Sequence, residues 1–299
     1  MVTKIIMKNL FIILLVFLTS VGVGFSQQIK PIPNLEIPKL KQNETVIKHY
    51  AYSLSYNEPN EQANWVAYKL TSEETNSTFK RANKFIQDPL VKSGIADDQD
   101  YAGSGFDKGH LAPAGDMGWS VTAMRESFYY SNMSPQVPSF NRGVWKRVEE
   151  LVRNWAREYK SVYIVTGPIL TSGLKTIGHD RVSVPKYFYK VILEYNSSGI
   201  KGIGFIIPNL SSQEQLQRFA VTIDSVEKVT GIDFFPSLPD AQEKVIESTL
   251  NIENWSWTNY KPAANKAKLS KAVQCSGITK KGTRCKNMTT NPNGRCHLH

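Results

Sequence analysis

Cysteine is missing from the first 274 residues of the chain, because Cys275, Cys285 and Cys296 all lie near the C-terminal end. Disulfide bonds therefore cannot hold the main part of the chain, which must be stabilised by packing. A chain of 299 residues, of which 41% are hydrophobic, is long enough to bury a core of that kind. We expect one mid-sized domain with appendages and exclude a small disulfide-stapled scaffold.

Acidic residues are missing from the last part of the chain. Residues 261–299, called the tail below, contain nine Lys or Arg and no Asp or Glu. Since the total charge is +10 and residues 1–26 carry Lys4 and Lys8, residues 27–260 are left with a charge of −1. This distribution predicts that general attraction to a polyanion resides in the tail, although a solvated basic end would have the same composition.

The chain also lacks an apolar run long enough to span a membrane comfortably. The longest run, residues 10–18, follows Lys4 and Lys8 and is followed by small residues up to Ser26. This order is typical of a signal peptide, so we expect cleavage near Ser26 and a secreted or periplasmic protein with no stable membrane association afterwards. An uncleaved N-terminal anchor is the alternative, and Met7 is a second plausible start.

Composition divides the rest of the chain into segments. The expected segments after the signal peptide at 1–26 are a proline-containing extended leader at 27–46, a main domain at 47–260, a basic linker at 261–274 and a Cys/His module at 275–299.

Hydrophobic patterns within the main domain predict an α+β fold. The β-rich runs are residues 46–56, 64–70, 162–166, 187–195 and 202–207. The first two are expected to be neighbouring antiparallel strands in a central, mainly antiparallel sheet, with His49 on the strand surface. The helices expected to flank this sheet are residues 141–160, 211–218, 222–229 (ended by Gly231) and 240–250.

Residues suited to hydrolytic chemistry are concentrated between residues 107 and 149. This stretch contains Asp-Lys-Gly-His at 107–110, Asn-Met-Ser-Pro-Gln at 132–136 and Asn-Arg-Gly-Val-Trp at 141–145. Phosphodiester hydrolysis needs a base for water, positive charge for the anionic transition state and stabilisation of the departing oxygen. His110 is the natural base, because the pKa of imidazole lies near neutrality.

The amide oxygen of Asn141 is the candidate metal ligand, because Mg²⁺ accepts few protein ligands and keeps several waters. If Asn141 opens a helix, Glu149 lies two turns later on nearly the same face, about 12 Å away, which favours contact with the metal through water. Asp107 is expected to brace the turn, and the backbone carbonyl of Asn132 is expected to fix the histidine tautomer.

Positively charged side chains flank this stretch. Arg81, with its bidentate fork, and Lys108, as a point charge, are candidates for neutralising phosphate. Arg142 and Lys146 lie four residues apart on the expected helix and form either a substrate-binding patch or a solvated face.

Together these motifs resemble the DNA/RNA non-specific endonucleases, the endonuclease G-like family of ββα-metal (His-Me finger) enzymes. Further matches at residues 64–68, at Arg81 and at residues 231–236 extend the resemblance over about residues 47–250. The resemblance implies a ββα-metal fold around an antiparallel sheet, with Mg²⁺ as cofactor and Mn²⁺ as the alternative. It also implies cleavage of DNA and RNA to 5′-phosphate and 3′-hydroxyl ends.

The resemblance carries roles to individual positions. It gives the general base to His110, the direct metal ligand to Asn141 and the acid that holds a metal-bound water to Glu149. It also places Asn132 beside the histidine and Arg81 at the scissile phosphate.

Lys108 departs from the family pattern, which usually has arginine at this position. Lysine keeps the positive charge but loses the bidentate fork. We therefore expect a weaker phosphate contact here, with the activity retained.

The tail offers a second set of ligand-type side chains. Cys275, Cys285, Cys296 and His299 are separated by nine, ten and two residues. Three thiolates and an imidazole suit tetrahedral Zn²⁺, and the arrangement resembles small Cys3His modules. The alternative in an oxidising compartment is one disulfide bond with one thiol left over. In either case we expect a compact basic module that tethers the enzyme to nucleic acid.

Two other functions compete with an exported, sugar-non-specific endonuclease that takes DNA and RNA as substrates. One is a degenerate nuclease core that only binds nucleic acid, against which the intact His110, Asn141 and Glu149 argue. The other is a narrower phosphodiesterase for small nucleotides, which dinucleotide substrates would separate from the first. The sequence does not define the oligomeric state.

Overall fold

A computed structural model describes residues 30–92, 94–196, 199–258, 273–279, 282–286 and 288–289. The expected signal peptide, most of the basic linker, Cys296 and His299 lie outside these residues. Among the helices within them, none combines the length and the apolar character needed to cross a membrane.

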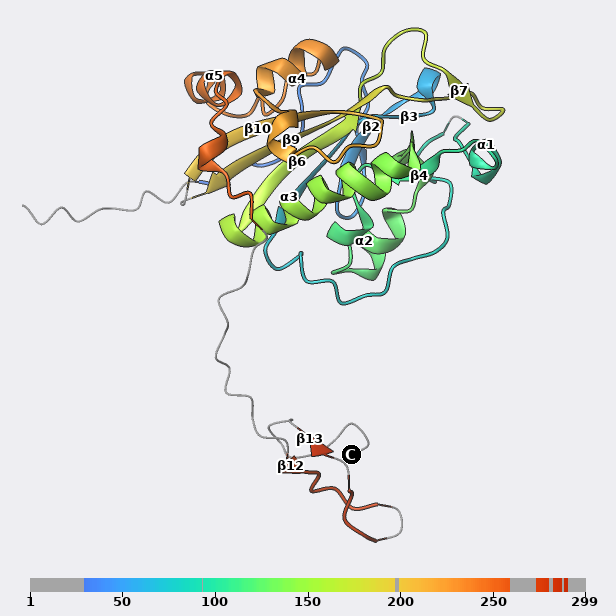
Figure 1. Ribbon diagram of the computed structural model, residues 1–299, viewed down its shortest axis with the longest axis vertical. Coiled ribbons are helices and arrows are strands. Elements are labelled where there is room, and N and C mark those ends of the chain that lie inside the picture. Colours follow the sequence, from blue (N-terminus) through green and yellow to red (C-terminus); the bar gives the residue numbers. More distant parts are fainter. Residues whose placement is uncertain are drawn as a thin grey trace, which may run out of the picture.

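A seven-stranded antiparallel sheet forms the centre of the domain (Figure 1). In spatial order its strands are β1 (Ile47–Lys48), β2 (Ser53–Asn57), β3 (Gln62–Thr71), β6 (Ser161–Pro168), β9 (Tyr187–Asn196), β10 (Gly199–Pro208) and β11 (Ala220–Val221). Side chains alternate between the two faces, so that Val66 and Tyr68 pack on one side while Trp65 and Ala67 pack on the other. Both faces are therefore buried, and the predicted mainly antiparallel sheet is confirmed.

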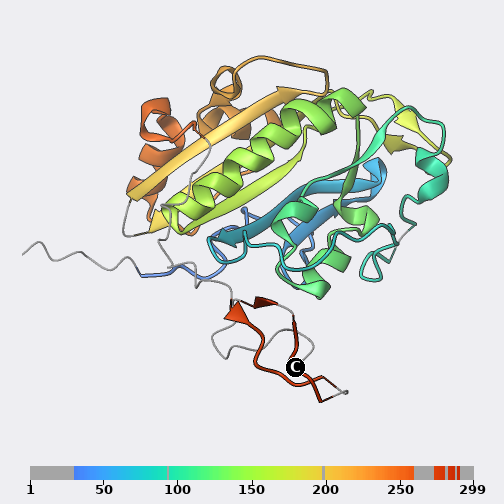
Figure 2. The same cartoon turned by 60° about the horizontal axis from the view of Figure 1, so that its bottom comes forward.

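Helices cover both faces of this sheet. The helix α3 (Lys146–Tyr159) lies along one face (Figure 2), where the predicted stripe of Val148, Val152 and Trp155 is buried. The helices α4 (Ile223–Thr230), ended by Gly231, and α5 (Asp240–Ser248) cover the other face (Figure 1).

The central motif lies on a separate two-stranded sheet. The strand β4 (Asp107–His110) pairs antiparallel with β5 (Met133–Gln136), and the chain then passes through a π-helical turn, η4 (Phe140–Trp145), into α3. Gly103 and Gly105 adopt left-handed φ values of 67° and 82° just before β4, which lets the chain turn sharply there. This strand, strand and helix order is the expected ββα unit, so the predicted fold class is confirmed.

Short elements connect these parts. They are α1 (Asp98–Tyr101), α2 (Val121–Glu126), β7 (Thr176–Ile177), β8 (Val182–Ser183), η1 (Glu58–Asn60), η2 (Ala114–Asp116), η3 (Tyr130–Asn132), η5 (Leu216–Phe219) and η6 (Ile252–Asn254). In the tail, β12 (Val273–Gln274) pairs antiparallel with β13 (Met288–Thr289).

Two helix predictions differ from the structure. Asn141 lies in the π-helical turn, and the regular α-helix begins only at Lys146, because Gly143 has non-helical angles (φ −108°, ψ −107°). Residues 211–218 form no α-helix, and only the short 3-10 turn η5 is present. The guanidinium of Arg147 donates to the carbonyl oxygens of Ser212 and Glu214, so these oxygens serve α3 instead of a local helix.

Candidate active site

His110 lies at the end of β4 in an aromatic pocket. The residue is 7% exposed, and its ring meets Phe128 edge-on at 4.7 Å and Phe85 at 5.9 Å between ring centroids. Burial lowers the pKa of the imidazole from 6.5 to about 3, and the positive charge of Arg81 adds to this shift. The imidazole is therefore neutral near pH 7, with a nitrogen lone pair available to accept a proton.

The neutral buried imidazole should make the folded protein sensitive to acid. Because the pKa of His110 is lower in the folded chain than in the unfolded one, only the unfolded chain takes up this proton between pH 6.5 and about 3. Stability falls as the pH falls, and we expect His110 to account for about 2 kcal/mol of the loss between about pH 6.5 and 4.5. Urea unfolding of wild type and His110→Asn across this range measures it. Equal slopes of unfolding free energy against pH would contradict a neutral buried imidazole.

Two further cations lie around this pocket. The guanidinium carbon of Arg81 stands 5.1 Å from the centroid of Phe128, the ring that also contacts His110, while the residue itself is exposed to solvent. Lys108 forms an ion pair with Asp98 and lies 4.3 Å from the centroid of the Phe85 ring. The structure thus brings Arg81 to the histidine and holds Lys108 against an acidic partner at the edge.

Asp107 fixes the orientation of Asn141. Its Oδ2 accepts hydrogen bonds from Asn141 Nδ2 at 2.8 Å and Arg142 Nε at 2.9 Å, and its Oδ1 accepts one from Arg142 Nη2 at 2.6 Å. Since a carboxylate only accepts hydrogen bonds, the amide nitrogen must face Asp107 and the amide oxygen must point elsewhere. That oxygen takes no hydrogen bond within the described residues, so it suits a hard cation.

The two other residues predicted to bind substrate, Arg142 and Lys146, both pair with acidic side chains. The fork of Arg142 is used to hold Asp107, and its contact with substrate stays a prediction. Lys146 is mostly exposed and lies 3.7 Å from Glu150, so its substrate contact also stays a prediction.

Glu149 faces the same site from α3. Burial raises its pKa to about 7, although the positive charges of Arg153 and Lys190 oppose the shift. The charge of Arg81 acts on both Glu149 and His110, so the strand β4 and the helix α3 present their functional groups around one cation.

A buried polar network behind Glu149 was not identified from the sequence. Asp116 is 1% exposed and accepts hydrogen bonds from Tyr68 Oη at 2.7 Å and from Arg153 Nη1 at 2.6 Å. Lys190 is equally buried, and its ammonium stands 4.8 Å from the Trp145 ring without a hydrogen-bond partner in the described part of the chain. A lysine in the middle of an apolar strand was the available sequence signal for this network.

Asn132 fixes the backbone that follows His110. Its Oδ1 accepts from the Ala112 N–H at 2.8 Å, and its Nδ2 donates to the carbonyls of Ala112 and Ser127 at 2.9 and 2.8 Å. The backbone carbonyl of Asn132 accepts from the Leu111 N–H at 3.0 Å. The expected bond from this carbonyl to the histidine ring is thus replaced by one to Leu111, and Asn132 positions the histidine through its chain.

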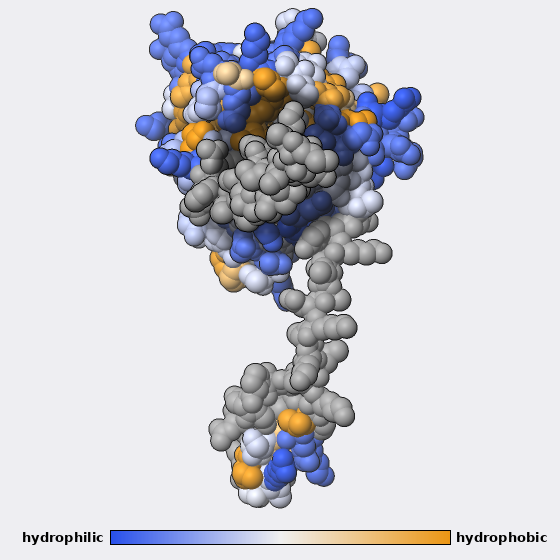
Figure 3. Space-filling model, turned by 90° about the vertical axis from the view of Figure 1, so that its left-hand side faces the viewer, coloured by the Kyte–Doolittle hydropathy of each residue, from blue (hydrophilic) through white to orange (hydrophobic). Residues whose placement is uncertain are grey.

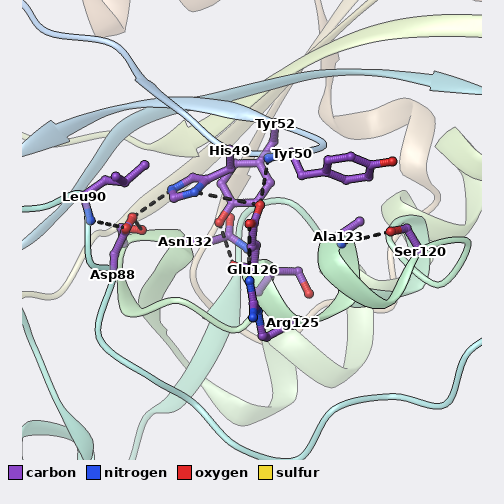
Figure 4. Close-up of polar contacts among 12 residues, drawn as sticks. His49, Tyr50, Tyr52, Asp88, Leu90, Ser120, Ala123, Arg125, Glu126 and Asn132 are labelled. Carbon is purple, nitrogen blue, oxygen red and sulfur yellow. Dashed lines mark hydrogen bonds and ion pairs between the residues drawn. The ribbon is translucent and has the colours of Figure 1, made fainter.

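His49 is linked through Asp88 to Ser131, the residue before Asn132. Its side chain is only 2% exposed, and its Nε2 lies 2.8 Å from Asp88 Oδ2 (Figure 4). The same carboxylate oxygen accepts from Ser131 Oγ at 2.5 Å. Glu126 lies 4.0 Å from the other ring nitrogen. The expected surface position was therefore wrong. The chain bends between β1 and β2, with His49 N–H bonded to Tyr52 O at 2.8 Å, and the bend turns the imidazole inward.

Two of the predicted zinc ligands lie in the described part of the tail. Cys275 is 0% and Cys285 5% exposed, and the two side chains pack together. The turn between them is closed by bonds from Cys285 N–H to Gly277 O at 2.8 Å and from Gly277 N–H to Cys275 Sγ at 3.3 Å. The other two predicted ligands, Cys296 and His299, lie outside the described residues.

Comparison with known proteins identifies the family. The family model for DNA/RNA non-specific endonucleases matches residues 34–241, which is more than half of the chain. Nuclease C1 of Cunninghamella echinulata var. echinulata is 36% identical over 212 residues, which cover 64% of this chain and 83% of that protein. The mitochondrial nuclease EXOG of Danio rerio is 38% identical over 206 residues, which cover 63% of this chain and 60% of that protein.

A solved structure agrees with these relatives. A chain in the crystal structure of an EndoG/EndoGI complex has a TM-score of 0.65 and 33% sequence identity, and the match covers 70% of this chain and 91% of that one. The matched region contains the ββα unit and every site residue described above except those of the tail. The chain therefore belongs to the DNA/RNA non-specific endonuclease family of nucleases.

Proposed function

We propose that the protein is an exported, metal-dependent endonuclease that hydrolyses phosphodiester bonds of DNA and RNA to 5′-phosphate and 3′-hydroxyl ends. One observation carries this proposal: a neutral buried imidazole and an exposed guanidinium meet at one aromatic ring, while Asp107 turns the amide oxygen of Asn141 away from itself. A base, a phosphate-binding cation and an oxygen ligand for a metal are the three groups that this hydrolysis requires.

The residues present fit a hard divalent cation. Asn141 would hold Mg²⁺ or Mn²⁺ directly through Oδ1, and Glu149 would contact it through water. When bound, the metal ion would supply positive charge to the phosphate and to the departing oxygen.

The side chains divide the remaining chemistry. His110 would accept a proton from the attacking water, and an arriving phosphate would raise the pKa of the imidazole because its negative charge opposes that of Arg81. Arg81 would bind the scissile phosphate with its fork, since its guanidinium is exposed beside Phe128. Activity on both DNA and RNA follows if recognition is confined to phosphate, because the 2′-hydroxyl is the group that distinguishes the two polymers.

Removing the partner of Asn141 should weaken metal use. In Asp107→Ala the amide is free to rotate, so we expect the Mg²⁺ concentration for half-maximal cleavage to rise by about 10- to 100-fold. Plasmid cleavage titrated with MgCl₂ measures this shift. Glu158→Ala, an exposed change on α3, serves as the control. An unchanged Mg²⁺ requirement in Asp107→Ala would refute the orienting role.

We further propose that the tail binds Zn²⁺ through Cys275, Cys285, Cys296 and His299 and tethers the enzyme to nucleic acid. The buried pair of thiols and the N–H to sulfur bond support the first two ligands. Deleting residues 261–299, which carry a charge of +9, should weaken DNA binding and flatten its dependence on salt while sparing the chemistry. Equal affinity of full and shortened chains at low and high salt would argue against tethering.

Export rests on the sequence of residues 1–26. We expect the mature protein outside the cytoplasm, with an N-terminus close to residue 27. Intact mass measured separately on the cytoplasmic and the exported fractions of the native cells tests this, and an uncleaved product in the cytoplasmic fraction alone would disprove export.

A further inference from the structure

Five carboxylates form two overlapping groups of three between α4 and α5, on the sheet face opposite α3. Asp224 and Glu227 come from α4, Glu243 and Glu247 come from α5, and Asp233 comes from the connection between them. Carboxylate oxygens of Asp224, Glu227 and Glu247 all lie within 4.8 Å of one another, and those of Asp233, Glu243 and Glu247 do the same. Glu247 is thus shared by two acidic triads.

Glu247 is the unusual member, because it is buried and its carboxylate is incompletely satisfied. The residue is 8% exposed, and its Oε1 is inaccessible with no hydrogen-bond partner among the described residues. A buried carboxylate oxygen without a partner is costly, so such groups are normally neutralised or bound to a metal. Its neighbours in this cluster can supply no hydrogen-bond donor while they are ionised, because ionised carboxylates only accept.

Compensation from the protein is small. Asp233 Oδ2 accepts from Lys39 Nζ at 3.0 Å, and this is the single ion pair of the cluster within the described residues; the Lys39 side chain is itself 69% exposed. Glu227 Oε1 accepts from the Phe234 N–H at 2.8 Å. Burial and the charges of Glu227 and Glu243 raise the pKa of Glu247 to about 8, which reflects uncompensated negative charge.

We propose that this cluster is a second cation site, separate from the nuclease centre, and that it binds Ca²⁺. All donors are carboxylate oxygens, which favour hard cations over Zn²⁺ or copper. Ca²⁺ takes six to eight oxygen ligands in irregular arrangements, whereas Mg²⁺ demands a near-ideal octahedron and keeps its waters. Two groups of three carboxylates that share Glu247, carried on two helices and a loop, form such an irregular arrangement and suit Ca²⁺.

The bound ion would join α4 to α5. Both helices contribute to the hydrophobic core on this face through Ile223, Val226 and Ile246, so a shared cation would hold the layer together. Figure 3 views the domain from the side on which α5 lies, and hydrophilic side chains predominate along its upper rim. Asp224 is exposed, which gives a hydrated ion a route into the cluster.

The test separates this site from the catalytic one. Residues 27–299 would be stripped with EDTA, and CaCl₂ would be titrated calorimetrically into Asn141→Ala, in which the predicted catalytic ligand is absent. We expect about one Ca²⁺ per chain in Asn141→Ala and none in Asn141→Ala with Glu247→Gln. Glu253→Gln, an exposed change in η6, should leave binding unchanged.

Thermal unfolding provides the second measurement. Ca²⁺ at 100 times its dissociation constant should raise the unfolding midpoint of Asn141→Ala by roughly 5–10 °C. The rise should vanish with Glu247→Gln. If that variant does not fold, Asp224→Asn, at an exposed position, should weaken Ca²⁺ binding at least about tenfold, since it removes a charged ligand.

Three results would overturn the proposal. The first is that Asn141→Ala takes up no Ca²⁺ up to millimolar concentration. The second is that adding Glu247→Gln or Asp224→Asn to Asn141→Ala leaves Ca²⁺ uptake unchanged. The third is that the thermal unfolding midpoint of Asn141→Ala does not respond to Ca²⁺ but rises when Glu247→Gln is added. The last would mean that a proton, not a cation, neutralises Glu247.

Discussion

His110→Ala is expected to lower DNA cleavage by about two to four orders of magnitude while leaving DNA binding intact. The substitution removes the neutral imidazole that lies against Phe128 and next to the positive charge of Arg81. No other imidazole in the described residues contacts this pocket: His49 is bound to Asp88, and His179 pairs with Asp100 and Asp180. Single-turnover cleavage at saturating enzyme measures the chemical step, and a binding assay without metal measures affinity.

The matched control for this prediction is His179→Ala. The His179 side chain is 61% exposed and contacts Asp100 and Asp180 away from the aromatic pocket, so its removal should change the cleavage rate by less than about twofold. Retention of more than about a tenth of the wild-type rate in His110→Ala would remove His110 from the role of base.

Asp116→Ala is expected to destabilise the folded protein by about 3–5 kcal/mol. Asp116 is buried, and it pairs with the largely buried guanidinium of Arg153 and accepts the hydrogen bond of Tyr68. Its removal leaves a buried cation and a buried hydroxyl without their partner, and such losses cost more than the intact pair contributes. Urea unfolding followed by fluorescence and circular dichroism measures the change in unfolding free energy.

Glu150→Ala provides the comparison on α3. The Glu150 side chain is 51% exposed and lies 3.7 Å from the Lys146 side chain, which is 62% exposed, so its loss should cost less than about 0.5 kcal/mol. If Asp116→Ala lowered the free energy of unfolding by less than about 1 kcal/mol, the network behind Glu149 would not contribute to the stability of the fold.

The site residues that lie close together in sequence could be predicted from it. Asp107, His110, Asn132, Asn141 and Glu149 were chosen from the chemistry of one short stretch and from its resemblance to the endonuclease family. The structure places the first three on or beside two paired strands that the sequence pattern did not predict. The long strands of the central sheet could be predicted, because strands whose two faces are buried read as nearly continuous apolar runs.

The residues that sequence reasoning missed act across long separations. Tyr68 and Asp116 meet from β3 and η2, and Lys190 reaches Trp145 from β9. No local pattern encodes such contacts, because they depend on which faces of two elements are packed together. His49 was misplaced for a related reason: its strand-like sequence bends at the point where Asp88, far along the chain, provides a buried partner.

The start of the main helix shows a second limit of prediction from the sequence. The apolar stripe predicted a continuous helix from Asn141, but the π-helical turn and the off-helix angles of Gly143 delay the regular helix to Lys146. In this turn Asn141 is held by Asp107 instead of by helix geometry. The departure from the expected helix therefore falls at the proposed metal ligand, where local strain and function commonly coincide.

The most direct test of the account is cleavage of supercoiled plasmid and of a structured RNA by purified residues 27–299, with Mg²⁺, with EDTA, and with Asn141→Ala. The account predicts that both polymers are cut in Mg²⁺, that EDTA stops cleavage, and that the variant is slower by about two orders of magnitude or more at equal Mg²⁺. Binding without cleavage across several divalent metals would contradict it and favour a nucleic-acid-binding protein. Cleavage of dinucleotides alone would contradict it in favour of a narrower phosphodiesterase.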